Sequence, residues 1–139
     1  MKKSFTLIEI LVVATIIGLL AAAAVVSYSQ IMKQARDGVR KTDLEQIRAA
    51  LEMYRSANDY YPSISISCNS NTAISDGTST YLSKIPTDPK CGIYSYFYST
   101  TGTDYTLGAY LEGSTSTCAV SVNCKGAGCN YCIGPYGEK

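Results

Sequence analysis

Histidine and tryptophan are absent from this chain of 139 residues, and phenylalanine occurs only twice. The lack of histidine removes the commonest general base and the commonest side-chain ligand of metal ions. Acidic and basic residues nearly balance, at a net charge of +1, so nothing indicates a nucleic-acid or other polyanionic partner. The sequence also lacks a nucleophile–base arrangement, a phosphate-binding glycine loop and a recognisable pair of catalytic acids. These absences predict that the protein is not an enzyme and has no cofactor.

Proline is missing from residues 1–61, so nothing in this part of the chain breaks a helix. Residues 10–26 carry one polar side chain, Thr15, and residues 5–28 form a helix about 36 Å long, enough to cross a bilayer. A secretory signal peptide is the rival interpretation, because a basic start precedes the apolar run. The run is long for a signal core, however, and continues without a break into an amphipathic part. We therefore predict a membrane helix.

Residues 29–58 continue this helix with one apolar side. Leu44, Ile47, Leu51 and Tyr54 recur at steps of three and four residues, which is the period of a buried helix face. Charged residues are assigned to the opposite, solvent-facing side: Arg40, Lys41, Asp43, Glu45, Arg48, Glu52 and Arg55. The sequence thus predicts one helix of roughly 50 residues, about 80 Å long, apolar all round in its first half and one-sided in its second.

The second half of the chain has a composition typical of β-structure, and ten of its residues after Asn58 are tyrosines. The helix is expected to end at Asn58, because Pro62 follows closely and disfavours helix before it. Residues 59–92 are interpreted as a long irregular connection. Residues 93–99 and 105–111 alternate with period two, and residues 119–122 are a third, shorter strand candidate. Three antiparallel strands packed on the apolar stripe of the helix predict an α+β fold.

All six cysteines lie in this second half: Cys68, Cys91, Cys118, Cys124, Cys129 and Cys132. An even number in the presumed external part favours disulfides and an oxidising compartment. Four thiolates from Cys118 onward could instead close a zinc site, and Cys129 and Cys132 form a C-x-x-C without the strand-to-helix context of a redox motif. We favour disulfides over metal. The preferred pairing joins Cys68 to Cys91, with the other four stapling the tail, although six cysteines permit fifteen complete pairings.

Glu9 lies near the start of the apolar run, where a carboxylate costs several kcal/mol unless something pairs with it. A cut before Phe5 would free a positively charged α-amine four residues upstream of Glu9. Residues 2–9, KKSFTLIE, resemble the processing signal of type IV prepilins and of type II secretion pseudopilins. Residues 81–89, YLSKIPTDP, resemble the segment that leads into the sheet in the major pseudopilin and related pilins. The resemblance therefore points to a pilin-like protein.

That resemblance implies that a membrane aspartyl peptidase cuts between Ser4 and Phe5 and N-methylates Phe5. The residue before the cut is usually glycine in the family, whereas Ser4 stands here. The methylated amine would then neutralise Glu9 of a neighbouring subunit as the helices bundle. The implied organisation is a leader at 1–4, a transmembrane or filament-core helix at 5–28, and a pilin-like head at 29–139. The head comprises the helix continuation at 29–58, the connecting loop at 59–92, and the sheet with its Cys-rich tail at 93–139.

The resemblance also implies the partners and the location. The partners are copies of the chain and related pilins in a filament, the prepilin peptidase, the inner-membrane assembly platform and the membrane. The chain would cross the inner membrane once, with a cytoplasmic N-terminus and a periplasmic or extracellular head, and form a surface or periplasmic filament after assembly. Major pseudopilins often carry an acidic calcium site in the C-terminal loop. Residues 112–139 do not reproduce that pattern, so no metal is expected.

Three functions compete on this basis. The main hypothesis is a structural subunit of a type IV pilus-like filament, which the Cys-rich tail and the missing calcium pattern favour. The alternative is a major, G-like pseudopilin of a type II secretion system, forming a periplasmic piston for protein export, which the PTDP segment at residues 86–89 and the short chain favour. The third is a membrane-anchored head with no filament. Only the third leaves Glu9 without a role.

Overall fold

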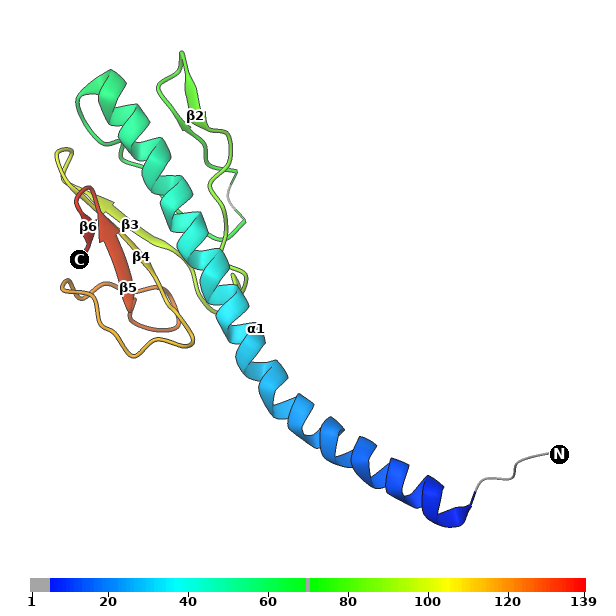
Figure 1. Cartoon of the computed structure of the whole chain (residues 1–139). Coiled ribbons are helices and arrows are strands. Elements are labelled where there is room, and N and C mark those ends of the chain that lie inside the picture. The colour runs from blue at the N-terminus through cyan, green and yellow to red at the C-terminus, as the bar shows by residue number, and fades with distance from the viewer. Residues whose placement is uncertain (1–5, 70) are drawn as a thin grey trace.

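A computed structural model describes residues 6–69 and 71–139 of the chain. One long helix, α1 (Leu7–Asn58), carries every strand on its second half, and its first half extends away from them (Figure 1). The strands are β1 (Ile74–Ser75), β2 (Thr80–Leu82), β3 (Phe97–Thr100), β4 (Tyr105–Ala109), β5 (Tyr131–Gly134) and β6 (Gly137–Glu138). This is the α+β, pilin-like fold expected from the sequence, and the prediction is confirmed.

Both ends of α1 are capped. Thr6 is the N-cap, with extended backbone, and its side chain accepts a hydrogen bond from the backbone N–H of Glu9 at 3.4 Å. At the other end Asp59 adopts the left-handed conformation, with φ of 66°, and donates its N–H to the carbonyl of Arg55 at 2.8 Å. The 52 residues between these caps form one uninterrupted α-helix.

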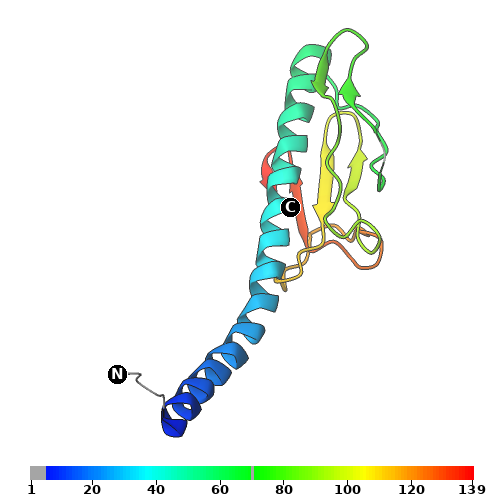
Figure 2. The ribbon, with the colours of Figure 1, turned by 90° about the vertical axis from the view of Figure 1, so that its right-hand side faces the viewer.

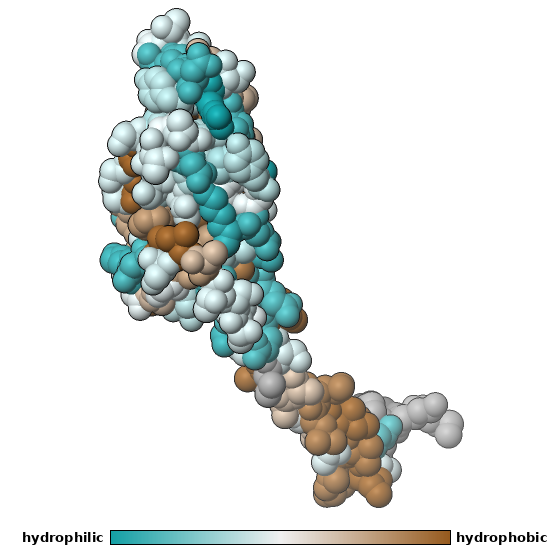
Figure 3. All heavy atoms as spheres, turned by 90° about the vertical axis from the view of Figure 1, so that its left-hand side faces the viewer, coloured by the Kyte–Doolittle hydropathy of each residue, from teal (hydrophilic) through white to brown (hydrophobic). Residues whose placement is uncertain are grey.

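The first half of α1 is apolar and has no partner in the monomer. Its large apolar side chains between Leu7 and Val25 are exposed by 47% or more, and Leu7 reaches 84%. On the face that Figure 3 shows, hydrophobic residues gather at the free end of α1, while the head is mostly hydrophilic or neutral with a small hydrophobic patch. By length and composition this helix is able to cross a membrane.

The head contains two antiparallel sheets. Four strands pair in the order β3-β4-β5-β6, with Tyr98 opposite Leu107 and Leu107 opposite Ile133. A separate hairpin joins β1 and β2. Figure 2 shows the strands lying along the upper half of α1, with the free half of the helix extending below. The core lies between these layers.

The predicted apolar stripe forms that core. Leu44, Ile47 and Leu51 have no exposed surface, and Tyr54 is 6% exposed. They pack with buried residues of the strands and connections: Tyr61, Ile74, Ile85, Tyr96, Tyr105, Leu107, Ala109 and Ile133. Burial of this stripe explains why the second half of α1 is one-sided.

Three details of the predicted strands are wrong. Residues 119–122 form no strand, and the third strand is β5, which lies inside the Cys-rich tail. The reason is burial, because Ile133 of β5 is 1% exposed whereas Val120 remains 49% exposed. The connection at 59–92 is also not wholly irregular, since it contains β1 and β2. Finally, β3 begins only at Phe97, and Tyr94 makes an isolated bridge to Lys125.

Candidate functional site

The residues expected to govern processing and assembly lie at the free end of α1. Ser4 and Phe5 fall outside the described residues. Glu9 lies in the first turn of the helix, three residues after the N-cap Thr6, and its neighbours Ile8 and Ile10 are 69% and 58% exposed. The roles of Ser4, Phe5 and Glu9 therefore stay predictions, with Glu9 exposed to whatever surrounds the helix.

The most densely bonded part of the described chain is a group of six charged side chains where α1 meets the lower end of the head. We call it the Arg40 cluster: Arg36, Asp37, Arg40, Asp88, Lys90 and Glu112. Three come from α1, two from the end of the connecting loop, and one from the residue three positions beyond β4. Three cations face three carboxylates, so the cluster is electrically balanced.

Arg40 lies at its centre, with a side chain that is 0% exposed. Its guanidinium binds Asp88 through two hydrogen bonds, of 2.7 Å from Nε and 3.0 Å from Nη2. Nη1 donates to Asp37 at 2.8 Å and to Glu112 at 3.0 Å. Burial opposes the charged form, but the hydrogen bonds from Arg40 to Asp88, Glu112 and Asp37 outweigh it and raise the pKa of Arg40. Arg40 is therefore a buried, fully paired cation.

Glu112 is the second point of convergence. It accepts two hydrogen bonds from Arg36, at 2.6 and 2.7 Å, and a third from Nζ of Lys90 at 2.7 Å. The hydrogen bonds from Arg36, with those from Lys90 and Arg40, hold the pKa of Glu112 well below its usual range in spite of partial burial. Asp37 also accepts the backbone N–H groups of Glu112 and Gly113, each at 2.8 Å. The cluster thus binds the chain after β4 to α1.

Arg40 is buried, so the prediction that it lies on the solvent-facing side of the helix is wrong. Asp37 and Arg40 continue the buried stripe of Leu44 and Ile47 toward the N-terminus, at the same steps of three and four. This spacing is the feature of the sequence from which the burial of Asp37 and Arg40 could have been predicted. Charge type alone misled, because arginine is almost never fully buried unless it is paired, and Asp88 and Glu112 lie 48 and 72 residues further along the chain.

Two other members of the predicted polar face bind tyrosines of the head. Tyr96 donates its hydroxyl hydrogen bond to Asp43 at 2.6 Å, and burial raises the pKa of Asp43 although this hydrogen bond opposes the rise. Glu52 accepts hydrogen bonds from Tyr61 at 3.1 Å and Tyr105 at 3.2 Å. These pairs attach α1 to the head above the Arg40 cluster.

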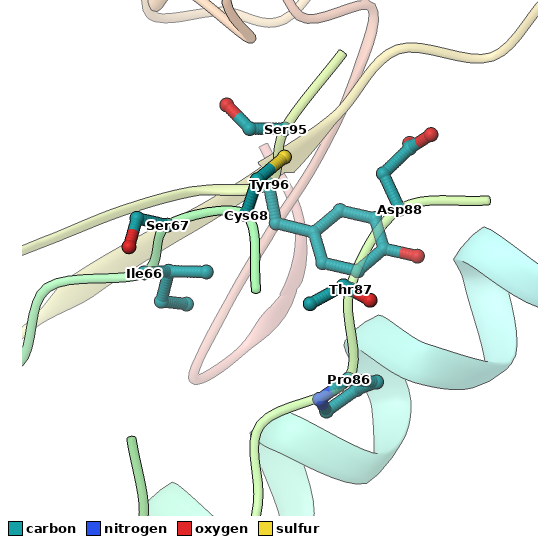
Figure 4. Close-up of a pocket in the computed structure, with 8 residues that line it drawn as sticks. All are labelled: Ile66, Ser67, Cys68, Pro86, Thr87, Asp88, Ser95 and Tyr96. Carbon is teal, nitrogen blue, oxygen red and sulfur yellow. The ribbon is translucent and has the colours of Figure 1, made fainter. Parts of the chain in front are cut away.

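A small hollow adjoins the Arg40 cluster on the side of the connecting loop. Figure 4 shows Tyr96 crossing it, with the hydroxyl directed toward α1, and its walls include Cys68, Pro86 and Asp88. The hollow has essentially no room for a water-sized molecule, whereas ligand pockets typically enclose about 300–1,000 Å³. Asp88 is the only carboxylate in its lining, and Arg40 already binds it. The hollow therefore offers no catalytic arrangement.

The six cysteines form three disulfides, so the expectation of a disulfide framework is confirmed. The pairs are Cys68–Cys91, Cys118–Cys132 and Cys124–Cys129. The first joins Cys68 to the end of the same connecting loop, and the other two lie in the tail that contains β5. The zinc interpretation fails, because every thiol it needs is part of a disulfide.

A long helix with an exposed apolar half, capped by a small disulfide-bonded antiparallel sheet, defines a protein of the pilin class. The sequence matches two families: the prokaryotic N-terminal methylation motif over residues 1–25, and type II secretion system (T2SS), protein G, over residues 27–116. A relative, type II secretion system core protein G of Pseudomonas aeruginosa, is 37% identical over 103 residues, which cover 68% of this chain and 72% of that protein. No solved structure matches.

The chain therefore belongs to the type II secretion system protein G family. This favours the G-like pseudopilin alternative over the main hypothesis of a type IV pilus subunit.

Proposed function

We propose that the protein is a structural subunit of a type II secretion pseudopilus, a short periplasmic filament that acts as a piston in protein export. The match to protein G over residues 27–116 carries this proposal. The exposed apolar half of α1 supports it, because a filament subunit needs a surface that suits both the bilayer and neighbouring helices. The proposed partners are copies of the chain, related pseudopilins and the inner-membrane secretion machinery.

We infer that the chain is processed before it assembles. The match to the N-terminal methylation motif supports cleavage between Ser4 and Phe5 with methylation of Phe5. The membrane helix would then run over residues 5–28, and the remainder would form a periplasmic head. Mass spectrometry of the membrane-extracted protein tests this directly. A methylated Phe5 terminus is expected, and an intact Met1 terminus would refute processing at this site.

Export is tested by deleting the gene and measuring secreted proteins and surface pili in the same strain. We expect secreted proteins to accumulate in the periplasm and surface pili to be unaffected. Recovery of export by the wild-type gene is the control. Loss of surface pili with normal export would return the protein to the pilus hypothesis.

Glu9 gives a residue-level prediction for the same function. Glu9→Ala is expected to leave membrane insertion intact and to reduce filament assembly and export at least tenfold, because the terminal amine of the neighbouring subunit loses its partner in an apolar environment. Assembly is quantified by chemical crosslinking in intact cells, followed by immunoblotting of the crosslinked multimers. Glu45→Ala is the matched control, since Glu45 lies on the same helix and is 53% exposed in the head. Filaments at wild-type abundance from Glu9→Ala would refute the role of Glu9.

A further inference from the structure

The Arg40 cluster lies at the point where α1 leaves the head. Asp37 is the first buried residue of the described part of the helix, and residues 7–35 remain exposed or half-exposed wherever their side chains are described. The stretch from Leu7 to Arg36 is about 44 Å long at about 1.5 Å per residue. It projects beyond the head as a lever (Figure 1). Any sideways force on this lever acts as a torque on the cluster.

The contact at this point is formed by ion pairs, whereas the contact above it is mainly apolar, with single tyrosine hydrogen bonds to Asp43 and Glu52. Fully buried apolar side chains of α1 begin at Leu44, two turns after Asp37. Apolar contacts are non-directional, so on their own they permit the helix to rock on the sheet. Bidentate arginine–carboxylate pairs fix both distance and direction. Arg40 makes such a pair with Asp88, and Arg36 makes one with Glu112.

The head side of this contact is itself stiff. Asp88 accepts the backbone N–H of Lys90 at 2.6 Å, and the adjacent Cys91 is bonded to Cys68. The chain around Glu112 is held by Asn130, which accepts from the N–H of Leu111 and donates to its carbonyl. Asn130 lies between Cys129 of one tail disulfide and Cys132 of the other. Both anchoring segments are therefore braced, and movement of the helix relative to them must disturb the cluster.

We propose that the Arg40 cluster is an angular joint that fixes the direction in which the free half of α1 leaves the head. Its contribution is to orientation more than to the free energy of unfolding. Buried ion pairs pay a large desolvation cost, and their balanced replacement by uncharged groups is often neutral for stability. The joint belongs to the single subunit and goes beyond the proposed function, because it holds whether the chain enters a pseudopilus, a pilus or no filament.

The test compares balanced double variants of the full-length protein in lipid nanodiscs. Arg40→Met with Asp88→Asn removes one cation and one anion from the cluster, and the asparagine oxygen still accepts the N–H of Lys90. Glu45→Gln with Arg48→Met is the control, since it removes a pair on the same helix with side chains 53% and 29% exposed, together with one hydrogen bond of 3.3 Å from Arg48 to the carbonyl of Pro135. Ketone-bearing amino acids at Ile17 and Ser83 carry the spin labels, so the disulfides stay intact.

Pulsed electron paramagnetic resonance then gives the distribution of distances between the two labels. Wild type and control are expected to show one narrow peak, and the joint variant a distribution at least twice as wide at a similar unfolding midpoint. A folded joint variant with the wild-type width would overturn the proposal. Lys90→Met with Glu112→Gln provides a second, balanced variant, at the other point where the hydrogen bonds of the cluster converge. If Arg40→Met with Asp88→Asn does not fold, a wild-type width in this second variant likewise overturns it.

Discussion

Gly108 in β4 is fixed by the disulfide-bonded tail. A Cβ atom at this position would lie 2.9 Å from Sγ of Cys129 and 3.2 Å from its Cβ. Gly108→Ala is therefore expected to lower the free energy of unfolding by about 1–3 kcal/mol, because Sγ of Cys129 is bonded to Cys124 and is not free to move away. Thermal unfolding of the full chain in detergent measures this change.

Gly38 is the matched control for Gly108. It lies on the exposed side of α1 and a Cβ there would meet nothing within 4 Å. Gly38→Ala is expected to raise the free energy of unfolding by about 0.5–1 kcal/mol, because alanine restricts the unfolded chain and favours helix. Equal stability of the two alanine variants would show that the tail yields at Gly108.

Glu112 predicts how acid weakens the head. Because Arg36 depresses its pKa in the folded protein, ionised Glu112 adds stability above its ordinary pKa of 4.5, and this stability is lost as pH falls through the lower, folded-state pKa. Glu112→Gln is expected to lower the urea midpoint at pH 7 and to flatten its pH dependence below about pH 5. The control is Glu138→Gln, at an exposed position of β6. A variant as acid-sensitive as wild type would contradict this account.

Among individual residues, the disulfide bonding of the cysteines was predictable from the sequence, whereas the pairing within the Arg40 cluster was not. Cysteine number and location suffice to predict disulfides, because the chemistry of the compartment acts on all of them. The burial of Arg40 depends on Asp88 and Glu112, which only folding brings to α1. A sequence lists the charges without their pairing, and it is the pairing that permits burial.

Among the elements, the helix was predicted to within two residues, and the sheet only in part. A helix depends on local hydrogen bonds and a local period, so Leu44 to Tyr54 identify it directly. Strand pairing joins distant segments, and β5 pairs with β4 from across the tail. Residues 119–122 show a strand-like pattern, but no strand of the described chain lies beside them to pair with.

The two strand assignments make a quantitative prediction. Ile133→Ala in β5 is expected to lower the free energy of unfolding by about 2–5 kcal/mol, because Ile133 is 1% exposed in the core. Val120→Ala, at the strand expected from the sequence, should change it by about 0.5 kcal/mol or less. Chemical unfolding in detergent measures both. A larger loss at Val120 would mean that residues 119–122 contribute to the core after all.

Across the whole molecule, the disulfides and the large exposed apolar surface lie in different parts. All three disulfides lie in the head, and α1 contains none of the six cysteines. Reduction is therefore expected to remove about 2–4 kcal/mol of stability for each bond and to lower the unfolding temperature of the head. The helical signal of the apolar first half of α1 should persist in detergent.

Calorimetry and circular dichroism before and after reduction separate these two effects. Thiol titration of the denatured, non-reduced protein is the control and should find no free thiols. Six free thiols would reject the disulfide framework.

The unpartnered first half of α1 also limits what can drive assembly. Inside a bilayer these side chains already lie in an apolar solvent, so moving them into a bundle of like helices gains almost no hydrophobic free energy. The free energy of moving the helix from lipid into the bundle is then close to zero. Close packing, a buried charge pair or external work must therefore supply the free energy that drives assembly. A filament whose subunits move between lipid and bundle at nearly equal free energy can both lengthen and return its subunits to the membrane with little loss of free energy.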